Sequence, residues 1–104
     1  MIVDSIQYNR CRALSCAVIL RALEDYSEIL AKSGIAKAAC SEVGRYFLEP
    51  GRRQYGFEWS CEQLDINPDR IRSRINTRGL MKLIRETKSI QEKYMRQRER
   101  QALG

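Results

Sequence analysis

The stretch FEWSCEQLDINPDRIRSRI, residues 57–75, decides the fold that this sequence predicts. It indicates a short helix over residues 57–65, a tight turn, and a second helix over residues 68–78. The apolar positions fall where two short helices would bury side chains against each other, at Phe57, Cys61, Leu64, Ile66, Ile71 and Ile75. The pattern predicts a helix-turn-helix over residues 57–78.

The second helix of this motif has a local start signal. Asn67 is a favoured N-cap, because its side-chain oxygen accepts a hydrogen bond from the first turn of a helix. Pro68 suits the first helical position, where its missing N–H has no cost. Asp65 stands where many such turns have glycine, and aspartate tolerates the left-handed conformation. The turn is therefore expected to form, with Trp59 anchoring the first helix to the rest of the protein.

Upstream of the motif the pattern is helical as well. Apolar residues recur at intervals of three and four over residues 10–32, and Gly34 is expected to end that helix. A second helix is expected over residues 35–49, where small side chains would let helices approach closely. Pro50 and Gly51 break it, and residues 51–56 are expected to form a loop.

Downstream, residues 80–94 again have helical spacing, and residues 95–104 are expected to fray. The predicted fold is all-α: a small helical bundle with a helix-turn-helix over residues 1–79, followed by a long basic C-terminal helix over residues 80–104. The apolar seam of that last helix would dock on residues 10–32 or pair with a partner or a second copy. Its residues are Leu80, Leu83, Ile84, Ile90 and Tyr94.

The charge is unevenly distributed along the 104 residues. Residues 1–50 carry six basic and six acidic side chains, whereas residues 51–104 carry thirteen basic and seven acidic ones, so the whole net charge of +6 lies in the second half. Such asymmetry favours a polyanionic partner. Since the excess coincides with the predicted helix-turn-helix, double-stranded DNA is the expected partner.

Enzymatic chemistry is not expected. The chain has no histidine, no Gly-rich phosphate loop and no nucleophile elbow, so we expect no catalytic residue and no cofactor. The four cysteines are 5, 24 and 21 residues apart, a spacing that suits buried free thiols better than a metal site. The longest apolar run, residues 13–20, is too short to cross a membrane, and the N-terminus lacks the pattern of a signal peptide, so the expected location is the cytoplasm.

Three segments resemble a group of small helical proteins from tailed phages and prophages: residues 18–26 (VILRALEDY), 42–49 (EVGRYFLE) and 57–75. Their shared motif is matched here as F-x-W-x-C-x-x-L-x-x-x-P-x-x-I-R, and its second half is similar to the promoter-reading helix-turn-helix of sigma factors. The chain departs from the usual motif at Asp65, in place of glycine, and at Ser60, in place of an apolar residue. The resemblance implies a DNA-binding transcription regulator that works in the cytoplasm of a bacterial host cell.

On this hypothesis the helix over residues 68–78 enters the major groove. Its outward face would present Arg72, Ser73 and Asn76 to base edges, since arginine reads guanine and asparagine reads adenine. Ile71 and Ile75 would be core. The phosphate contacts would come from Arg52, Arg53, Arg70, Arg74, Arg78, Lys82 and Arg85.

A second hypothesis stays open. A small basic helical protein can bind and modulate a host protein such as RNA polymerase or a nucleic-acid enzyme. The long C-terminal helix favours it, because a minimal DNA reader does not need one. Its seam would then be the surface for the partner or for a homodimer.

Overall fold

The computed structural model describes residues 2–51, 53 and 56–103, with side chains described between residues 11 and 96 of those ranges. In this part of the chain all the regular structure is helical, which confirms the all-α prediction. The helices are α1 (Ile2–Cys40), α2 (Glu42–Leu48), α3 (Phe57–Gln63), α4 (Pro68–Arg74) and α5 (Gly79–Leu103).

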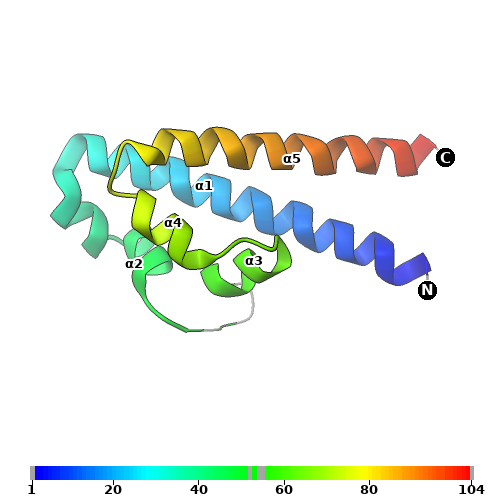
Figure 1. The fold of residues 1–104 in the computed structure, drawn as a ribbon, viewed down its shortest axis with the longest axis horizontal. Helices are drawn as coiled ribbons and strands as arrows, with labels where there is room; N and C mark the ends of the chain where they lie inside the picture. The colour runs from blue at the N-terminus through cyan, green and yellow to red at the C-terminus, as the bar shows by residue number, and fades with distance from the viewer. Residues whose placement is uncertain (1, 52, 54–55, 104) are drawn as a thin grey trace.

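The two long helices, α1 and α5, run antiparallel along the 48 Å length of the molecule, and both termini lie at the same end (Figure 1). Leu80, Leu83 and Ile84 of α5 are buried, while Ile90 and Tyr94 are partly buried against the same core. The seam of α5 therefore packs within the molecule. Burial of Leu80, Leu83 and Ile84 leaves these three residues no exposed apolar face for a partner or a second copy, whereas Ile90 and Tyr94 are only partly buried.

The three short helices lie together on one side of α1 (Figure 1). Their contact with it is aromatic: Phe47 of α2 meets Tyr26 of α1 edge to face, with ring centroids 5.9 Å apart, and meets Phe57 of α3 at 5.0 Å. Tyr46 adds edge contacts to both phenylalanines. These rings form the centre of the core, whereas Trp59, the expected anchor, is half-buried on α3.

The first half of the chain is more helical than its pattern predicts. The helix expected over residues 10–32 begins at Ile2, and Gly34 interrupts it with φ 85° and ψ 175°, so the predicted break is confirmed. The helix expected over residues 35–49 is divided at Ser41, whose side chain accepts a hydrogen bond from the Gly44 N–H at 3.1 Å and caps α2.

The last helix is also longer than predicted. Residues 95–103 continue α5 as regular helix, where the sequence predicts a frayed tail. The physical reason is that Gln, Arg, Glu, Ala and Leu are good helix formers, and extending an existing helix adds a hydrogen bond per residue without a new nucleation step.

Candidate nucleic-acid interface

The segment that links α3 to α4 has the predicted turn. Asp65 adopts φ 56°, which places it in the left-handed region. The N–H of Ile66 donates to the carbonyl of Cys61 at 2.9 Å, folding the chain back beneath α3. Asn67 then caps α4 by accepting from the Asp69 N–H at 3.0 Å, and Pro68 takes the first helical position. The start signal of the motif is confirmed residue by residue.

One side of this motif belongs to the core. Ile71 is 3% exposed and Ile75 is fully buried, so their predicted core role is confirmed. Ile75 caps the end of α4, which stops at Arg74 rather than at the expected residue 78. The four residues that follow, 75–78, form the connection to α5, where the Thr77 hydroxyl accepts from the Gly79 N–H at 3.0 Å.

Arg72 does not lie on the outward face, and that expectation is wrong. Its side chain is 19% exposed, and its Nη2 pairs with Oε1 of Glu58 at 3.0 Å. Nε donates to the Phe47 carbonyl at 2.6 Å, Nη2 is 3.4 Å from the Glu49 carbonyl, and the guanidinium lies 5.3 Å from the Phe57 ring centre. The guanidinium thus joins the C-terminal end of α2 to α3 and α4.

The position of Arg72 has an electrostatic reason. The end of a helix exposes carbonyl groups that attract a cation, and Phe47 and Glu49 present theirs at the end of α2. Glu58 supplies a full negative charge beside the same guanidinium, and its other oxygen accepts from the Gly51 N–H at 3.2 Å. A planar side chain with five donors can satisfy several such acceptors at once.

The other two predicted base contacts are exposed. Ser73 faces solvent, with its hydroxyl donating to the Arg70 carbonyl at 2.9 Å. Asn76 lies just beyond α4, and its side-chain oxygen accepts a hydrogen bond from the Tyr26 hydroxyl. This hydrogen bond orients the Asn76 side chain, because its donor, Tyr26, is a buried residue of α1. Burial raises the pKa of Tyr26, an effect that the hydrogen bond to Asn76 partly offsets, so the phenol stays protonated as a donor.

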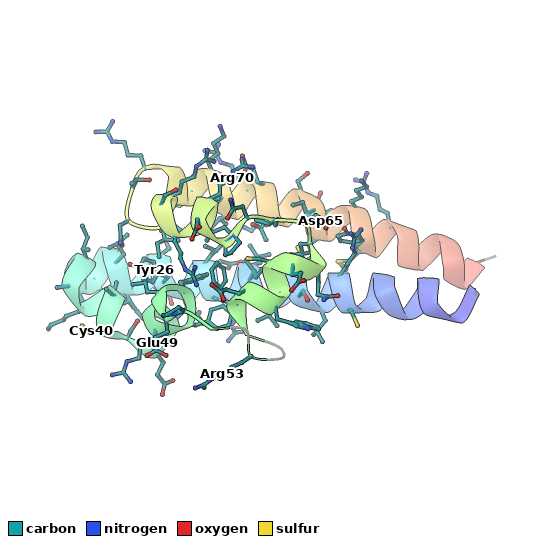
Figure 2. All side chains as sticks on the ribbon, turned by 60° about the horizontal axis from the view of Figure 1, so that its bottom comes forward. Tyr26, Cys40, Glu49, Arg53, Asp65 and Arg70 are labelled. Carbon is teal, nitrogen blue, oxygen red and sulfur yellow. The ribbon has the colours of Figure 1, made fainter. Side chains whose placement is uncertain are left out.

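The predicted phosphate contacts form two groups. Arg70 is about half exposed and lies 3.6 Å from Glu86 of α5, which ties α4 to that helix. Lys82 is exposed four residues before Glu86 and so shares its side of α5. Arg78 is exposed in the connection between the two helices, and Arg74 is half-buried beside it. Figure 2 shows Arg70 on the face of α4 that points away from the interior.

Of the remaining predicted phosphate contacts, Arg85 is exposed on α5 and is turned by about 60° from Lys82 around the helix. Arg53 is exposed in the loop after α2, at the opposite side of the view in Figure 2 from Arg70. Arg52 lies outside the described residues.

Arg12 of α1 contacts the turn of the helix-turn-helix, and the sequence pattern of the motif does not predict this contact. Its Nη2 pairs with Oδ2 of Asp65 at 2.7 Å, its Nε donates to the Gln63 carbonyl at 2.9 Å, and its Nη1 donates to the Tyr94 hydroxyl at 3.3 Å. One side chain of α1 thereby holds both the turn of the motif and the outer part of α5. Because these partners are 51 to 82 residues away, no local signal points to them.

The cysteines are free, and two of them match the prediction of buried thiols. Cys16 and Cys61 are buried, whereas Cys11 and Cys40 are exposed. Burial raises the pKa of Cys16 to about 11 and that of Cys61 to about 12. The Cys16 thiol donates to the Thr87 carbonyl at 3.3 Å, so it contributes to the contact between α1 and α5.

The described residues contain no group of three or more cysteine, aspartate or glutamate side chains placed to hold a metal ion. None of their helices combines the length and the apolar character needed to cross a membrane.

Comparison of the chain with protein-family models, with curated proteins and with solved structures finds no match. The resemblance to small phage proteins therefore stays a prediction.

Proposed function

We propose that this chain binds duplex DNA as a transcription regulator of the phage or prophage type, with the exposed side of α4 in the major groove. The observation that carries the proposal is the two-sided character of α4. Ile71 is buried beneath it, while Asp69, Arg70 and Ser73 face solvent on a helix that is capped and bonded at both ends. A major groove of B-DNA is about 12 Å wide and admits such a helix.

The base contacts are revised from those that the sequence suggests. Arg70 replaces Arg72 as the candidate for guanine, because it is the more exposed arginine and, among the described residues, its one ion pair is long. Ser73 and Asn76 remain candidates, the latter through its amide group. Arg78 and Lys82 are the candidates for phosphates, since they are exposed directly beyond α4.

Two lysines of α5 provide a matched test of this surface. Lys82 and Lys88 are both exposed, but they are turned by about 120° from each other, and Lys88 lies beside Arg21 and Met81 between α1 and α5. In titrations of a labelled duplex, Lys82→Ala is expected to weaken binding and to reduce the salt slope by about 1. Lys88→Ala is expected to leave both unchanged. Equal effects of the two variants would contradict the proposed orientation.

The second hypothesis keeps only part of the surface that it uses, the partly buried Ile90 and Tyr94. A module that binds RNA polymerase or a nucleic-acid enzyme through the seam of α5 needs Leu80, Leu83 and Ile84 at the surface, and each of them is less than a tenth exposed. If duplex DNA does not bind, the next experiment is a pull-down with the full chain, which tests for a protein partner.

A further inference from the structure

Asn76 is an exposed residue whose side chain is held from the interior of the molecule. It follows α4, and its side-chain oxygen Oδ1 accepts a hydrogen bond from the hydroxyl of Tyr26, a fully buried residue of α1. The ring of Tyr26 packs edge to face on Phe47, with ring centroids 5.9 Å apart, so the core fixes where this hydroxyl lies. A candidate base contact therefore depends on a residue that DNA cannot touch.

The backbone on both sides of Asn76 is fixed as well. The N–H of Ile75 donates to the Ile71 carbonyl at 3.1 Å, and the Ile75 side chain is fully buried. The N–H of Thr77 donates to the Arg74 carbonyl, also at 3.1 Å. Since the Asn76 side chain is already ordered in the free protein, a contact made by its amide group would lose little conformational entropy on binding.

The Tyr26 hydroxyl determines which end of the Asn76 amide group faces outward. A buried hydroxyl proton needs an acceptor, and in the described part of the chain Asn76 Oδ1 accepts this one. The amide nitrogen of asparagine is a donor only, so it cannot replace Oδ1 as the acceptor of that proton. Because Oδ1 is turned inward to the hydroxyl, the NH2 group on the other branch of the amide is the part that can meet DNA.

We propose that Tyr26 is a positioning residue for the reading of DNA, and that it makes Asn76 a donor that prefers guanine to adenine. The inference rests on the proposed function, because it names the base that this part of the DNA surface reads. Guanine presents two neighbouring acceptors in the major groove, N7 and O6, and both suit an NH2 group. Adenine presents N7 beside the N6 amino donor, so its paired contact with asparagine needs the oxygen that Tyr26 holds.

Base preference separates this role from a purely structural one. Tyr26→Phe keeps the packed ring and removes only the hydroxyl, so the Asn76 amide becomes free to turn its oxygen outward. A purely structural role predicts that this variant binds every duplex more weakly by the same factor. A positioning role predicts a changed preference at one base pair, because base contacts carry the sequence information.

The test is a selection of the full chain from random duplexes, followed by titrations in which single base pairs of the enriched motif are varied. Asn76→Ala is expected to abolish the preference at one base pair, where the parent chain favours guanine. Tyr26→Phe is expected to lower the ratio of guanine to adenine affinity at that base pair about tenfold, the size of one good contact to a base. The matched control is Tyr46→Phe, which removes a buried hydroxyl from another ring that packs on Phe47 and is expected to keep the ratio.

The results that overturn this inference differ from those that overturn the proposed function. Adenine at the base pair that depends on Asn76 would overturn the role of Tyr26 while the reading of DNA stands. So would a Tyr26→Phe variant that keeps the guanine preference, or an Asn76→Ala variant that changes no base preference. A selection without an enriched motif would overturn the proposed function, and this inference with it.

An NMR measurement without DNA tests the orientation of the amide by itself. In the full chain labelled with nitrogen-15, both side-chain amide protons of Asn76 are expected to exchange readily with water, because the NH2 group faces outward. Tyr26→Phe is expected to move their signals towards those of a free asparagine, and Tyr46→Phe is not. In the parent chain, an Asn76 amide proton protected from exchange would show that the nitrogen faces the hydroxyl. That result would overturn the proposal even if the Tyr26 variant does not fold.

Discussion

Arg70 and Arg72 show that the surroundings of an arginine side chain, and not its residue type alone, decide which contacts it makes. Arg72 meets two carbonyls, two carboxylates and an aromatic ring, whereas Arg70 has an ion pair at 3.6 Å and more than half of its side chain in water. Surface pairs of the second kind contribute little to stability, while removing one partner of a buried pair leaves the other uncompensated.

This contrast predicts the effect of removing each arginine. Arg72→Ala is expected to lower the free energy of unfolding by about 2–4 kcal/mol, because Glu58 and the carbonyls of α2 lose their donor. Arg70→Ala is expected to lower it by less than about 1 kcal/mol while weakening DNA binding. Urea denaturation of both variants measures the difference. Similar losses would contradict the assignment of Arg72 to the interior.

Asp65 combines a backbone requirement with an ion pair to Arg12. Asp65→Ala is expected to destabilise the protein by about 1–2 kcal/mol, because alanine disfavours φ 56° and has no carboxylate. Asp65→Gly is expected to stay within about 1 kcal/mol of the parent, since glycine relieves the strain as the ion pair is lost. Thermal melts of the two variants decide between them, and a glycine variant as unstable as the alanine variant would refute the role of the backbone.

The buried thiols predict a pH dependence. The pKa of Cys61 rises from 9.0 to about 12, chiefly by burial, with a smaller lowering effect of Arg72. The unfolded chain therefore loses this thiol proton at a lower pH than the folded one, so stability is intact below pH 9.0 and falls as pH rises from there to about 12.

Denaturation curves measured between pH 8 and pH 11 test this slope. Cys61→Ala is expected to reduce the fall in unfolding free energy with pH, whereas Cys11→Ala, at an exposed thiol, is expected to keep it. An unchanged slope in the Cys61 variant would show that other groups cause the alkaline loss.

At the scale of the helices, the junction between α1 and α2 depends on a close approach. A Cβ at Gly44 would lie 2.1 Å from the Ala38 carbonyl oxygen and 2.5 Å from that of Ala39, which are impossible contacts with backbone atoms. Gly44→Ala is therefore expected to cost more than about 2 kcal/mol of stability. Leu48→Ala, at a side chain 39% exposed on the same helix, is the control and should lower the melting temperature much less.

The sequence predicts the ends of helices well where the residues that form them are close to one another in the chain. Asn67, Pro68 and Gly34 act through their own backbone or the next turn, so their effect is visible in sequence. The helical pattern over residues 35–49 does not predict the division at Ser41, although the Ser41 cap and the close approach of Gly44 to Ala38 and Ala39 all lie within six residues. The small residues before it indicated a close approach without indicating the break.

The candidate site was less predictable than the fold. Helical periodicity identified Ile71 and Ile75 as core, but it could not say where the arginines beside them would point. The destination of Arg72 is set by acceptors 14, 23 and 25 residues earlier in the chain, and that of Arg12 by partners still further away. Only the assembled bundle brings these groups together.

At the scale of the whole molecule, α1 and α5 form a frame that holds the helix-turn-helix on one side. Arg12 extends from α1 to the turn before α4, Tyr26 extends from α1 to Asn76 in the connection after it, and Arg70 joins α4 to α5. The long C-terminal helix, which a minimal DNA reader would not need, is thus part of the support of α4. Its role in the structure does not require a protein partner.

The central claim is that α4 reads DNA sequence. Selection of the full chain against a pool of random duplexes, at near-physiological salt and with sequencing of the bound fraction, tests it most directly. The account predicts an enriched motif that is lost when Arg70 and Ser73 are both replaced by alanine and kept when Lys88 is replaced. Binding without enrichment, or no binding to duplex DNA at all, would contradict it.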